Sequence, residues 1–273
     1  MTKLLGVLGD PIAQSLSPAI HNYWIRQQGL QATYEALRVD KGDFTEALDV
    51  LAMRDAVGFN VTMPHKIAAH DACTTLSPAA KAIGAVNTLT LCEDKTWDGH
   101  NTDADGFLAA LKMQNIEITP QTKTIVIGAG GAARAIVYAL SSINSLPLIL
   151  NRTEARARQL SLDLTGGESV YGPIDSLYGF ASNADLVINT ISLAHEGKVL
   201  NLPKGGKRPF IHISYGPTTT QQLALAADQG WVTHDGLPML VSQAAYSFER
   251  WFGVHPPTEE ILERCKTMVT VTS

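Results

Sequence analysis

The sequence has few cysteines and lacks any long apolar run. Its three cysteines, Cys73, Cys92 and Cys265, show no CxxC spacing, so neither a disulfide framework nor a zinc site is predicted. No stretch approaches the roughly 18 apolar residues that span a bilayer, and the apolar run that ends at Gly9 is too short for a signal peptide. Free thiols without such signals are typical of a cytoplasmic protein, which is the location we expect.

The sequence also has no excess of basic charge. There are 26 acidic residues against 21 lysines and arginines, giving a formal net charge of -5, and the basic residues are scattered. This balance argues against nucleic acid or a membrane as partner and favours a small molecule. No group of potential ligands has the spacing of a metal site, so no metal is expected. The sequence leaves both a monomer and a homodimer open.

What the sequence does contain is an alternation of short apolar runs with amphipathic stretches, over 273 residues. This pattern is typical of parallel sheets covered by helices, and the length suits two domains. We predict an α/β fold with an N-terminal α/β substrate domain, 1–101, completed by C-terminal helices at about 239–273. A Rossmann-type doubly wound dinucleotide-binding domain is predicted over 102–238.

Within these domains the apolar pattern predicts individual elements. Strands are expected at 4–8, 33–39, 57–62, 85–91, around Trp97, and at 124–127, 146–150, 186–189 and 210–213. Helices are expected at 18–28, 44–53, 105–113, 132–140 and 239–252. Ser17 and Asp43 are placed to cap the first two helices.

A glycine-rich turn follows the β-branched strand at 124–127. Gly128-x-Gly130-x-x-Ala133 precedes a predicted helix, which is the context that a dinucleotide fingerprint requires. The first glycine permits the tight turn, and the second lets the backbone approach a pyrophosphate at the helix N-terminus. Close packing of strand on helix also uses glycines, but this context favours a cofactor. The predicted contacts are Gly128, Ala129, Gly130, Gly131 and Ala132.

The end of the next predicted strand indicates which cofactor. NAD-binding units usually place an acidic residue about 20 residues after the turn, where it binds the ribose 2′-OH. Here Asn151 replaces the acid, and Arg152 and Arg156 add positive charge. Arginines at a helix start are also commonly just solvated, but a guanidinium matches a 2′-phosphate well. The pattern favours NADP, with Asn151, Arg152, Thr153 and Arg156 as contacts.

Small polar residues gather beside prolines and glycines in the first domain. They lie in SLSP (15–18), NVTMPHK (60–66), GAVNT (84–88) and GHNTD (99–103). Taken singly, each has a structural explanation, such as a helix cap for Ser17, a turn for Asn60 or a surface charge for Lys66. Their density favours a substrate pocket in this domain.

Taken in order, the motifs resemble the shikimate dehydrogenase family, within the shikimate/quinate dehydrogenase superfamily. The matching segments are SLSPAIHN (15–22), NVTMPHK (60–66), GAVNT (84–88), NTD (101–103), GAGGAA (128–133), NRT (151–153) and DGLPMLVSQAAYSF (235–248). The resemblance implies NADP-dependent, reversible reduction of 3-dehydroshikimate to shikimate, a step in aromatic amino acid biosynthesis. Alternatives are a divergent paralogue acting on quinate or a related cyclohexane acid, and a cofactor-binding regulator without turnover.

The resemblance also implies residue roles. Lys66 and Asp103 correspond to the catalytic pair at the reacting hydroxyl, where a lysine can stabilise charge and relay a proton. Which of the two carries the proton is not decided by the sequence. Substrate contacts or their supports are Ser15, Ser17, Asn60, Thr62, Lys66, Asn87, Asp103, Tyr215 and Gln243, with the two serines and Tyr215 at the carboxylate. Ile213 and Gly236 correspond to cofactor contacts.

Several positions depart from the family pattern. Gln14 stands where histidine is usual, and His212 replaces an aspartate three residues before Tyr215. Ile213 and Gly216 stand in the run where an apolar residue, often methionine, is usual. The stretch 189–197 lacks the glycine that normally lies two residues after its serine, and Pro238 replaces glycine. Because proline fixes φ and removes a donor, we expect a loop of reduced freedom at 238. These changes leave the turnover rate and the exact substrate open.

Overall fold

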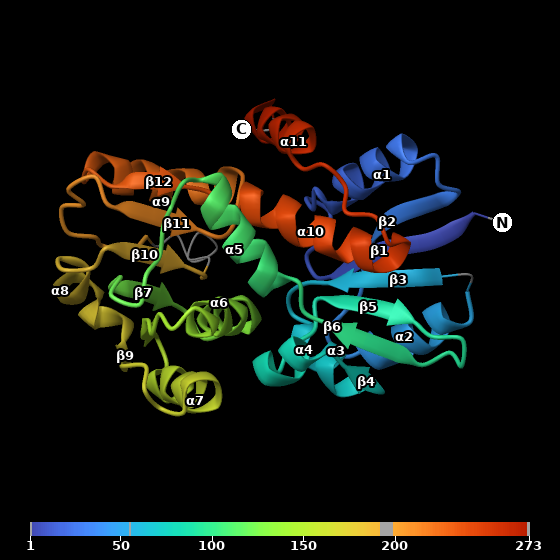
Figure 1. Ribbon diagram of the computed structural model, residues 1–273, viewed down its shortest axis with the longest axis horizontal. Coiled ribbons are helices and arrows are strands. Elements are labelled where there is room, and N and C mark those ends of the chain that lie inside the picture. Colours follow the sequence, from blue (N-terminus) through green and yellow to red (C-terminus); the bar gives the residue numbers. More distant parts are fainter. Residues whose placement is uncertain (1, 55, 192–198, 272–273) are drawn as a thin grey trace. The chain divides into compact units, whose positions relative to one another are not determined.

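The computed structural model describes residues 2–54, 56–191 and 199–271, and the chain divides into two compact units (Figure 1). Unit 1 is Met1–Gly106 with Leu240–Ile261, and unit 2 is Phe107–Met239 with Leu262–Ser273. Each unit holds one six-stranded sheet with helices packed on it, which confirms the predicted α/β class. The domain limits expected from the sequence, 1–101 with about 239–273 and 102–238, stay a prediction.

Unit 1 is built on a mixed sheet in the order β2-β1-β3-β5-β6-β4. Its strands are β1 Lys3–Gly9, β2 Ala32–Arg38, β3 Ala56–Val61, β4 Thr75–Leu76, β5 Thr88–Leu91 and β6 Trp97–His100. β1 pairs in parallel with β2 and β3, whereas β5 runs antiparallel to β3 and β6. In this register Asn60 lies opposite Thr88, and Thr88 lies opposite His100. The end of β3, the start of β5 and the end of β6 are therefore neighbours.

Helices pack on both faces of this sheet. They are α1 Ser17–Gln27, α2 Phe44–Ala52, α3 Lys66–Ala72, α4 Pro78–Ile83, the start of α5 Asp103–Met113, and α10 Leu237–Phe252 from residue 240 onward. Phe59 and Leu89 belong to the apolar core with Phe44 and Leu48 of α2. Because side chains alternate along a strand, Asn60 faces away from this core, toward α10, where its Nδ2 lies 2.9 Å from Ser247 Oγ.

Neither of the two predicted cap residues caps its helix with a side-chain hydrogen bond. α1 begins at Ser17 itself, its N-cap position is Leu16, and no side chain caps it. Asp43 does occupy the N-cap of α2, but its φ of -104° and ψ of 5° are not the extended backbone that turns a cap side chain toward the helix. Ser77 is a working cap, since its Oγ accepts a hydrogen bond from the backbone N–H of Ala80.

Unit 2 contains a parallel sheet in the order β12-β11-β10-β7-β8-β9. The strands are β7 Thr124–Ile127, β8 Leu148–Asn151, β9 Tyr171–Pro173, β10 Leu186–Asn189, β11 Pro209–His212 and β12 Val232–His234. The helices are α6 Gly131–Ser142, α7 Glu154–Thr165, α8 Leu177–Ala181 and α9 Pro217–Asp228, with α11 Glu259–Val271 near the C-terminus. This strand order is that of the doubly wound Rossmann fold, which binds ligands where the order reverses. In unit 2 that point lies between β7 and β10.

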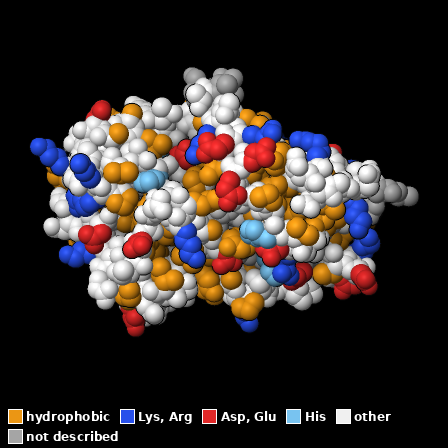
Figure 2. All heavy atoms as spheres, turned by 45° about the horizontal axis from the view of Figure 1, so that its top comes forward, with side chains coloured by type: hydrophobic (Ala, Val, Ile, Leu, Met, Phe, Trp, Pro, Cys, Tyr) orange, Lys and Arg blue, Asp and Glu red, His pale blue; other side chains and the backbone are white. Residues whose placement is uncertain are grey.

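Three further findings concern the surface, the helices and the potential metal ligands. Charged side chains of both signs are interspersed with apolar ones on the face that Figure 2 shows. Among the described residues, no helix is long and apolar enough to cross a membrane. Within the same residues, no group of three His, Cys, Asp or Glu side chains is arranged to hold a metal ion.

Candidate active site

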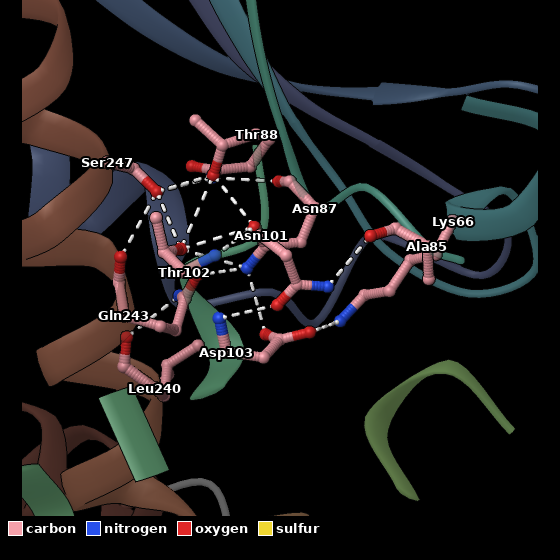
Figure 3. Close-up of polar contacts among 11 residues, drawn as sticks. Lys66, Ala85, Asn87, Thr88, Asn101, Thr102, Asp103, Leu240, Gln243 and Ser247 are labelled. Carbon is pink, nitrogen blue, oxygen red and sulfur yellow. Dashed lines mark hydrogen bonds and ion pairs between the residues drawn. The ribbon is translucent and has the colours of Figure 1, made fainter. Parts of the chain in front are cut away.

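Lys66 and Asp103 form a largely buried ion pair in unit 1 (Figure 3). Nζ of Lys66 lies 2.5 Å from Oδ2 of Asp103, and the two side chains are 17% and 6% exposed. Lys66 is the first residue of α3, which follows β3, and Asp103 is the first residue of α5, which follows β6. The sheet brings these two helix starts together. The negative charge of Asp103 is favoured at the N-terminus of α5 by the helix dipole.

The amide of Asn87 holds the other oxygen of this carboxylate. The backbone N–H of Thr102 donates to Oδ1 of Asn87 at 2.8 Å. Because a backbone N–H can only donate, this contact fixes which end of the amide is oxygen. The Nδ2 end therefore faces Asp103 Oδ1 at 2.9 Å and Gln243 Oε1 at 3.2 Å. Both oxygens of Asp103 thus accept hydrogen bonds, one from Lys66 and one from Asn87.

The side-chain amide of Asn60 is also oriented by its hydrogen bonds. Its Nδ2 donates to the carbonyl oxygen of Asn87 at 3.1 Å, and its Oδ1 accepts from the hydroxyl of Tyr34 at 2.7 Å. Burial raises the pKa of Tyr34 well above its ordinary value, so the phenol keeps its proton, and a hydrogen bond with Ser17 opposes that rise. The ring of His21 stacks on Tyr34 with centroids 4.1 Å apart.

The remaining predicted substrate residues lie near strand ends. Ser17 is buried and its backbone N–H donates to Oγ of Ser15 at 3.3 Å. Thr62 directly follows β3, and its backbone N–H donates to the carbonyl oxygen of Leu8 at 2.9 Å. Tyr215 is half-buried in unit 2, in the segment between β11 and α9.

The glycine turn of unit 2 leads directly into the N-terminus of α6. Gly128 has a φ of +117°, and a Cβ there would clash with the side chain of Thr190, so both the backbone and the space require glycine. Gly130 is the N-cap of α6 and no side chain caps this helix. A Cβ at Gly130 would meet no atom within 4 Å. With Ala129 in the turn and Gly131 and Ala132 opening α6, the helix N-terminus is left accessible to an anion.

The predicted 2′-phosphate residues lie at the adjacent strand end. Nδ2 of Asn151, the last residue of β8, donates to the carbonyl oxygen of Thr153 at 2.9 Å, and the backbone N–H of Arg156 donates to the same oxygen at 3.0 Å. The side chains of Arg152 and Arg156 are exposed at the start of α7. One carboxylate, that of Glu154, lies between them in sequence. These residues fit the phosphate-bearing end of NADP.

Ile213 and Gly236 lie side by side in unit 2. The backbone N–H of Gly236 donates to Ser214 at its carbonyl oxygen, 2.9 Å away, and a Cβ on Gly236 would clash with the carbonyl of Ile213. Only glycine permits this close approach of the two segments. The structure thus brings together two residues that the sequence connects only through the family resemblance.

Several departures from the family pattern have local explanations. Nδ1 of His212 accepts the backbone N–H of Ser214 at 3.2 Å, much as Oδ1 of Asn189 accepts that of Ile191 at 3.1 Å. Burial lowers the pKa of His212 to about 4, which keeps this nitrogen an acceptor. Gly216 has a φ of +82°, which favours glycine over an apolar residue. Gln14 is exposed, and the position two residues after the serine of the 189–197 stretch lies outside the described residues.

The loop expected at Pro238 is wrong. Pro238 is the second residue of α10, and a proline in the first turn of a helix removes only an N–H that has no partner within the helix. Asp235 completes this helix start, since its Oδ1 accepts the backbone N–H of Leu237 at 3.0 Å.

Four residues whose side chains form hydrogen bonds with Asn60 or Asn87 were not predicted as site residues, namely Tyr34, Thr88, Thr102 and Ser247. Thr88, Thr102 and Ser247 lie within motifs that were noted, GAVNT, NTD and the C-terminal segment, so their signal was present. Tyr34 lies in a strand and carries no motif. Its hydroxyl is identified only by the fold, which places it 2.7 Å from Oδ1 of Asn60.

A doubly wound dinucleotide-binding sheet, together with a second unit that carries a buried Lys–Asp pair, defines the class of nicotinamide-dependent dehydrogenases. Three family models match the chain: the shikimate dehydrogenase substrate binding domain at residues 7–89, shikimate / quinate 5-dehydrogenase at 109–202, and the shikimate 5'-dehydrogenase C-terminal domain at 236–266. The chain belongs to the shikimate dehydrogenase family.

Individual relatives are similar over nearly their whole length. The shikimate dehydrogenase (NADP(+)) of Hyphomonas neptunium is 44% identical over 273 residues, which is 100% of both chains. The solved shikimate 5-dehydrogenase of Thermus thermophilus in complex with NADP(H) and shikimate is 32% identical, with a TM-score of 0.84 over 97% of this chain and 99% of that one. A shikimate dehydrogenase in complex with NADP+ matches with a TM-score of 0.87 at 30% identity, over 98% and 96% of the two chains.

Proposed function

We propose that this chain is an NADP-dependent shikimate dehydrogenase, which reversibly reduces 3-dehydroshikimate to shikimate in aromatic amino acid biosynthesis. The observation that carries the proposal is the buried Lys66–Asp103 ion pair, with Asn87 on the second carboxylate oxygen. It occurs in a chain whose relative of 44% identity, matched from end to end, is named for this activity.

Lys66 would supply the proton in the reducing direction. NADPH, when bound, supplies a hydride to the carbonyl carbon, and negative charge then develops on the carbonyl oxygen. Asp103 accepts hydrogen bonds on both oxygens and has no proton to give, whereas the ammonium of Lys66 has protons beyond the one that faces Asp103. Lys66 would therefore stabilise the oxygen and protonate it, while Asp103 orients the ammonium. In the oxidising direction the same proton returns to Lys66.

The substrate would be held by hydroxyl and amide groups of the polar segments. Ser15 and Ser17, with Tyr215, would bind the carboxylate, and Asn60, Thr62, Asn87 and Gln243 would contact or support the ring hydroxyls. Asn60 already directs its two amide hydrogens to Asn87 and to the hydroxyl cluster around Ser247. It would therefore meet a ring hydroxyl as an acceptor, through the lone pair of Oδ1 that the hydroxyl of Tyr34 does not use.

NADP would bind to unit 2 through the glycine turn and the start of α7. The N–H groups at the start of α6 would take the pyrophosphate, and Arg152 and Arg156 the 2′-phosphate. Ile213 and Gly236 would lie at the nicotinamide end. The three free thiols agree with a cytoplasmic location, which is part of this proposal, and a monomer or a homodimer stays a prediction.

A four-way turnover assay tests the function. Absorbance of the reduced nicotinamide is followed with shikimate or quinate, each offered with NADP and with NAD. The proposal expects the highest kcat/KM for shikimate with NADP. Turnover of quinate alone would assign the chain to a quinate-oxidising paralogue, a reaction that the matched shikimate / quinate model also covers. Cofactor binding without turnover of either acid would favour a regulator.

A further inference from the structure

Ser247 of α10 lies at the centre of a buried hydroxyl cluster that links four parts of unit 1 (Figure 3). Its side chain is 0% exposed, and its Oγ lies 2.8 Å from Oγ1 of Thr88 and 3.1 Å from Oγ1 of Thr102. It also receives Nδ2 of Asn60 at 2.9 Å and donates to the carbonyl oxygen of Gln243 at 3.0 Å. The partners belong to β3, β5, α10 and the segment just before α5.

The direction of these hydrogen bonds follows from the backbone. Nδ2 of Asn60 is fixed as the donor end because it faces the carbonyl oxygen of Asn87, so Ser247 must accept from Asn60. Thr88 donates to Oδ1 of Asn87 at 2.9 Å, so the single proton of Ser247 is shared between Oγ1 of Thr88 and the carbonyl oxygen of Gln243. The hydroxyl of Ser247 therefore connects the amide of Asn60 with the hydroxyl of Thr88, which is a second donor to Oδ1 of Asn87 beside the backbone N–H of Thr102. Nδ2 of Asn87 faces Asp103 and Gln243.

A purely local role would not require these contacts. The hydroxyl of a serine in a helix commonly donates a hydrogen bond to the carbonyl four residues earlier. For such a role the contact with the carbonyl of Gln243 alone would be enough. The contacts with Asn60 and Thr88 instead span 187 and 159 residues of sequence. Buried polar groups that lose one such partner must rotate or remain unsatisfied, and both results disturb their neighbours.

We propose that Ser247 is a positioning residue, whose hydroxyl holds Asn60 directly and Asn87 through Thr88 in the rotamers that receive the ring hydroxyls of the substrate. It acts through these amides and does not itself contact the substrate. This inference rests on the proposed function for the identity of the substrate, but the positions of the two amides can be tested without it.

The test compares Ser247→Ala and Ser247→Cys with Ser161→Ala. Cysteine nearly keeps the shape of serine but is a weak hydrogen-bond donor and acceptor, so it separates hydrogen bonding from packing. Ser161 is a matched control, because it is also 0% exposed and donates to a backbone carbonyl, that of Ser169, in unit 2. KM for shikimate, KM for NADP, kcat and Tm are measured for each variant.

Both Ser247 variants are expected to raise KM for shikimate by about 3- to 12-fold, the effect of one ordinary hydrogen bond, and to leave KM for NADP unchanged. Ser161→Ala is expected to lower Tm without changing either KM. An unchanged KM for shikimate in Ser247→Ala, or a Ser247→Cys protein that behaves like the wild type, would overturn the proposal.

A crystal structure of Ser247→Ala separates this inference from the proposed function. Rotated side chains of Asn60 and Thr88 would support positioning even if the wild type failed to oxidise shikimate. The same side chains in unchanged rotamers would overturn it even if the wild type were active. Should the alanine variant not fold, the structure and kinetics of Ser247→Cys provide the same comparison.

Discussion

The side-chain amide of Asn87 donates a hydrogen bond to Oδ1 of Asp103, with 2.9 Å between nitrogen and oxygen, while Lys66 lies 2.5 Å from Oδ2. The carboxylate is therefore held from two sides before any substrate is present. Since the backbone N–H of Thr102 fixes the orientation of Asn87, the reacting groups are preorganised by the main chain.

Asn87→Asp is expected to abolish most activity. The change preserves shape but replaces the N–H that faces Asp103 with a second carboxylate oxygen, so that a donor becomes a repelling acceptor. We expect kcat to fall by about 100-fold or more and the free energy of unfolding to fall by about 1–3 kcal/mol. Asn115→Asp, at an exposed position, is the matched control. Wild-type kcat in Asn87→Asp would show that this amide does not hold the carboxylate.

Arg152→Ala and Arg156→Ala are expected to weaken NADP selectively. Loss of a charged hydrogen bond to the 2′-phosphate corresponds to an increase of about 10- to 100-fold in KM for NADP. KM for NAD, which lacks that phosphate, should hardly change. Arg158→Ala is the control, since Arg158 lies exposed on α7, the helix that also carries Arg156. Equal losses for NADP and NAD would show that neither arginine binds the 2′-phosphate.

His212 makes the stability of the protein depend on pH. Burial lowers its pKa from 6.5 to about 4, so between these values the unfolded chain binds a proton that the folded chain does not. The free energy of unfolding should therefore fall as the pH falls from 6.5 to 4, by up to about 3 kcal/mol from this residue. Chemical denaturation across that range measures the slope.

His212→Asn is the informative comparison for this pH dependence. Asparagine cannot titrate, but its Oδ1 can accept the N–H two residues later, as that of Asn189 does. The variant should show a shallower slope between pH 4 and 6.5. The slope that remains includes the contribution of His21, whose pKa burial lowers to about 3. An unchanged slope would mean that His212 does not titrate in this range.

Pro238→Gly is expected to destabilise the protein. Pro238 lies in the first turn of α10, where its fixed φ suits the helix and restricts the unfolded chain. Glycine should lower the free energy of unfolding by about 1 kcal/mol, and alanine by less, as measured by denaturant titration. A glycine variant as stable as the wild type would argue that this proline does not contribute to the helix start.

Strongly patterned parts of the fold were predictable from the sequence. The strand at 124–127 matches β7, and 186–189 matches β10, because buried parallel strands are short runs of apolar residues. Short or amphipathic helices such as α3, α4 and α9 were missed. α3 begins at Lys66, directly after Pro64 and His65, and its seven residues are too few to show a helical period.

The candidate site was predictable in residue type but not in geometry. Motif order identified Lys66, Asn87 and Asp103, yet no pattern indicates that Asn87 faces Asp103 with its nitrogen. That orientation depends on the register in which β5 pairs with β3 and β6, a contact between distant segments. The hydroxyl of Tyr34 could not be assigned for the same reason.

The most direct measurement of the central claim is turnover of shikimate with NADP by the wild type, Lys66→Ala and Asp103→Asn, with NADP binding measured in parallel. The wild type should reduce NADP. Both variants should lose activity by about 100- to 10,000-fold, the usual contribution of general acid–base catalysis, because one removes the proton donor and the other the carboxylate that orients it. Both should bind NADP as the wild type does. Wild-type turnover in either variant, or a wild type that binds NADP but leaves shikimate unchanged, would contradict the account.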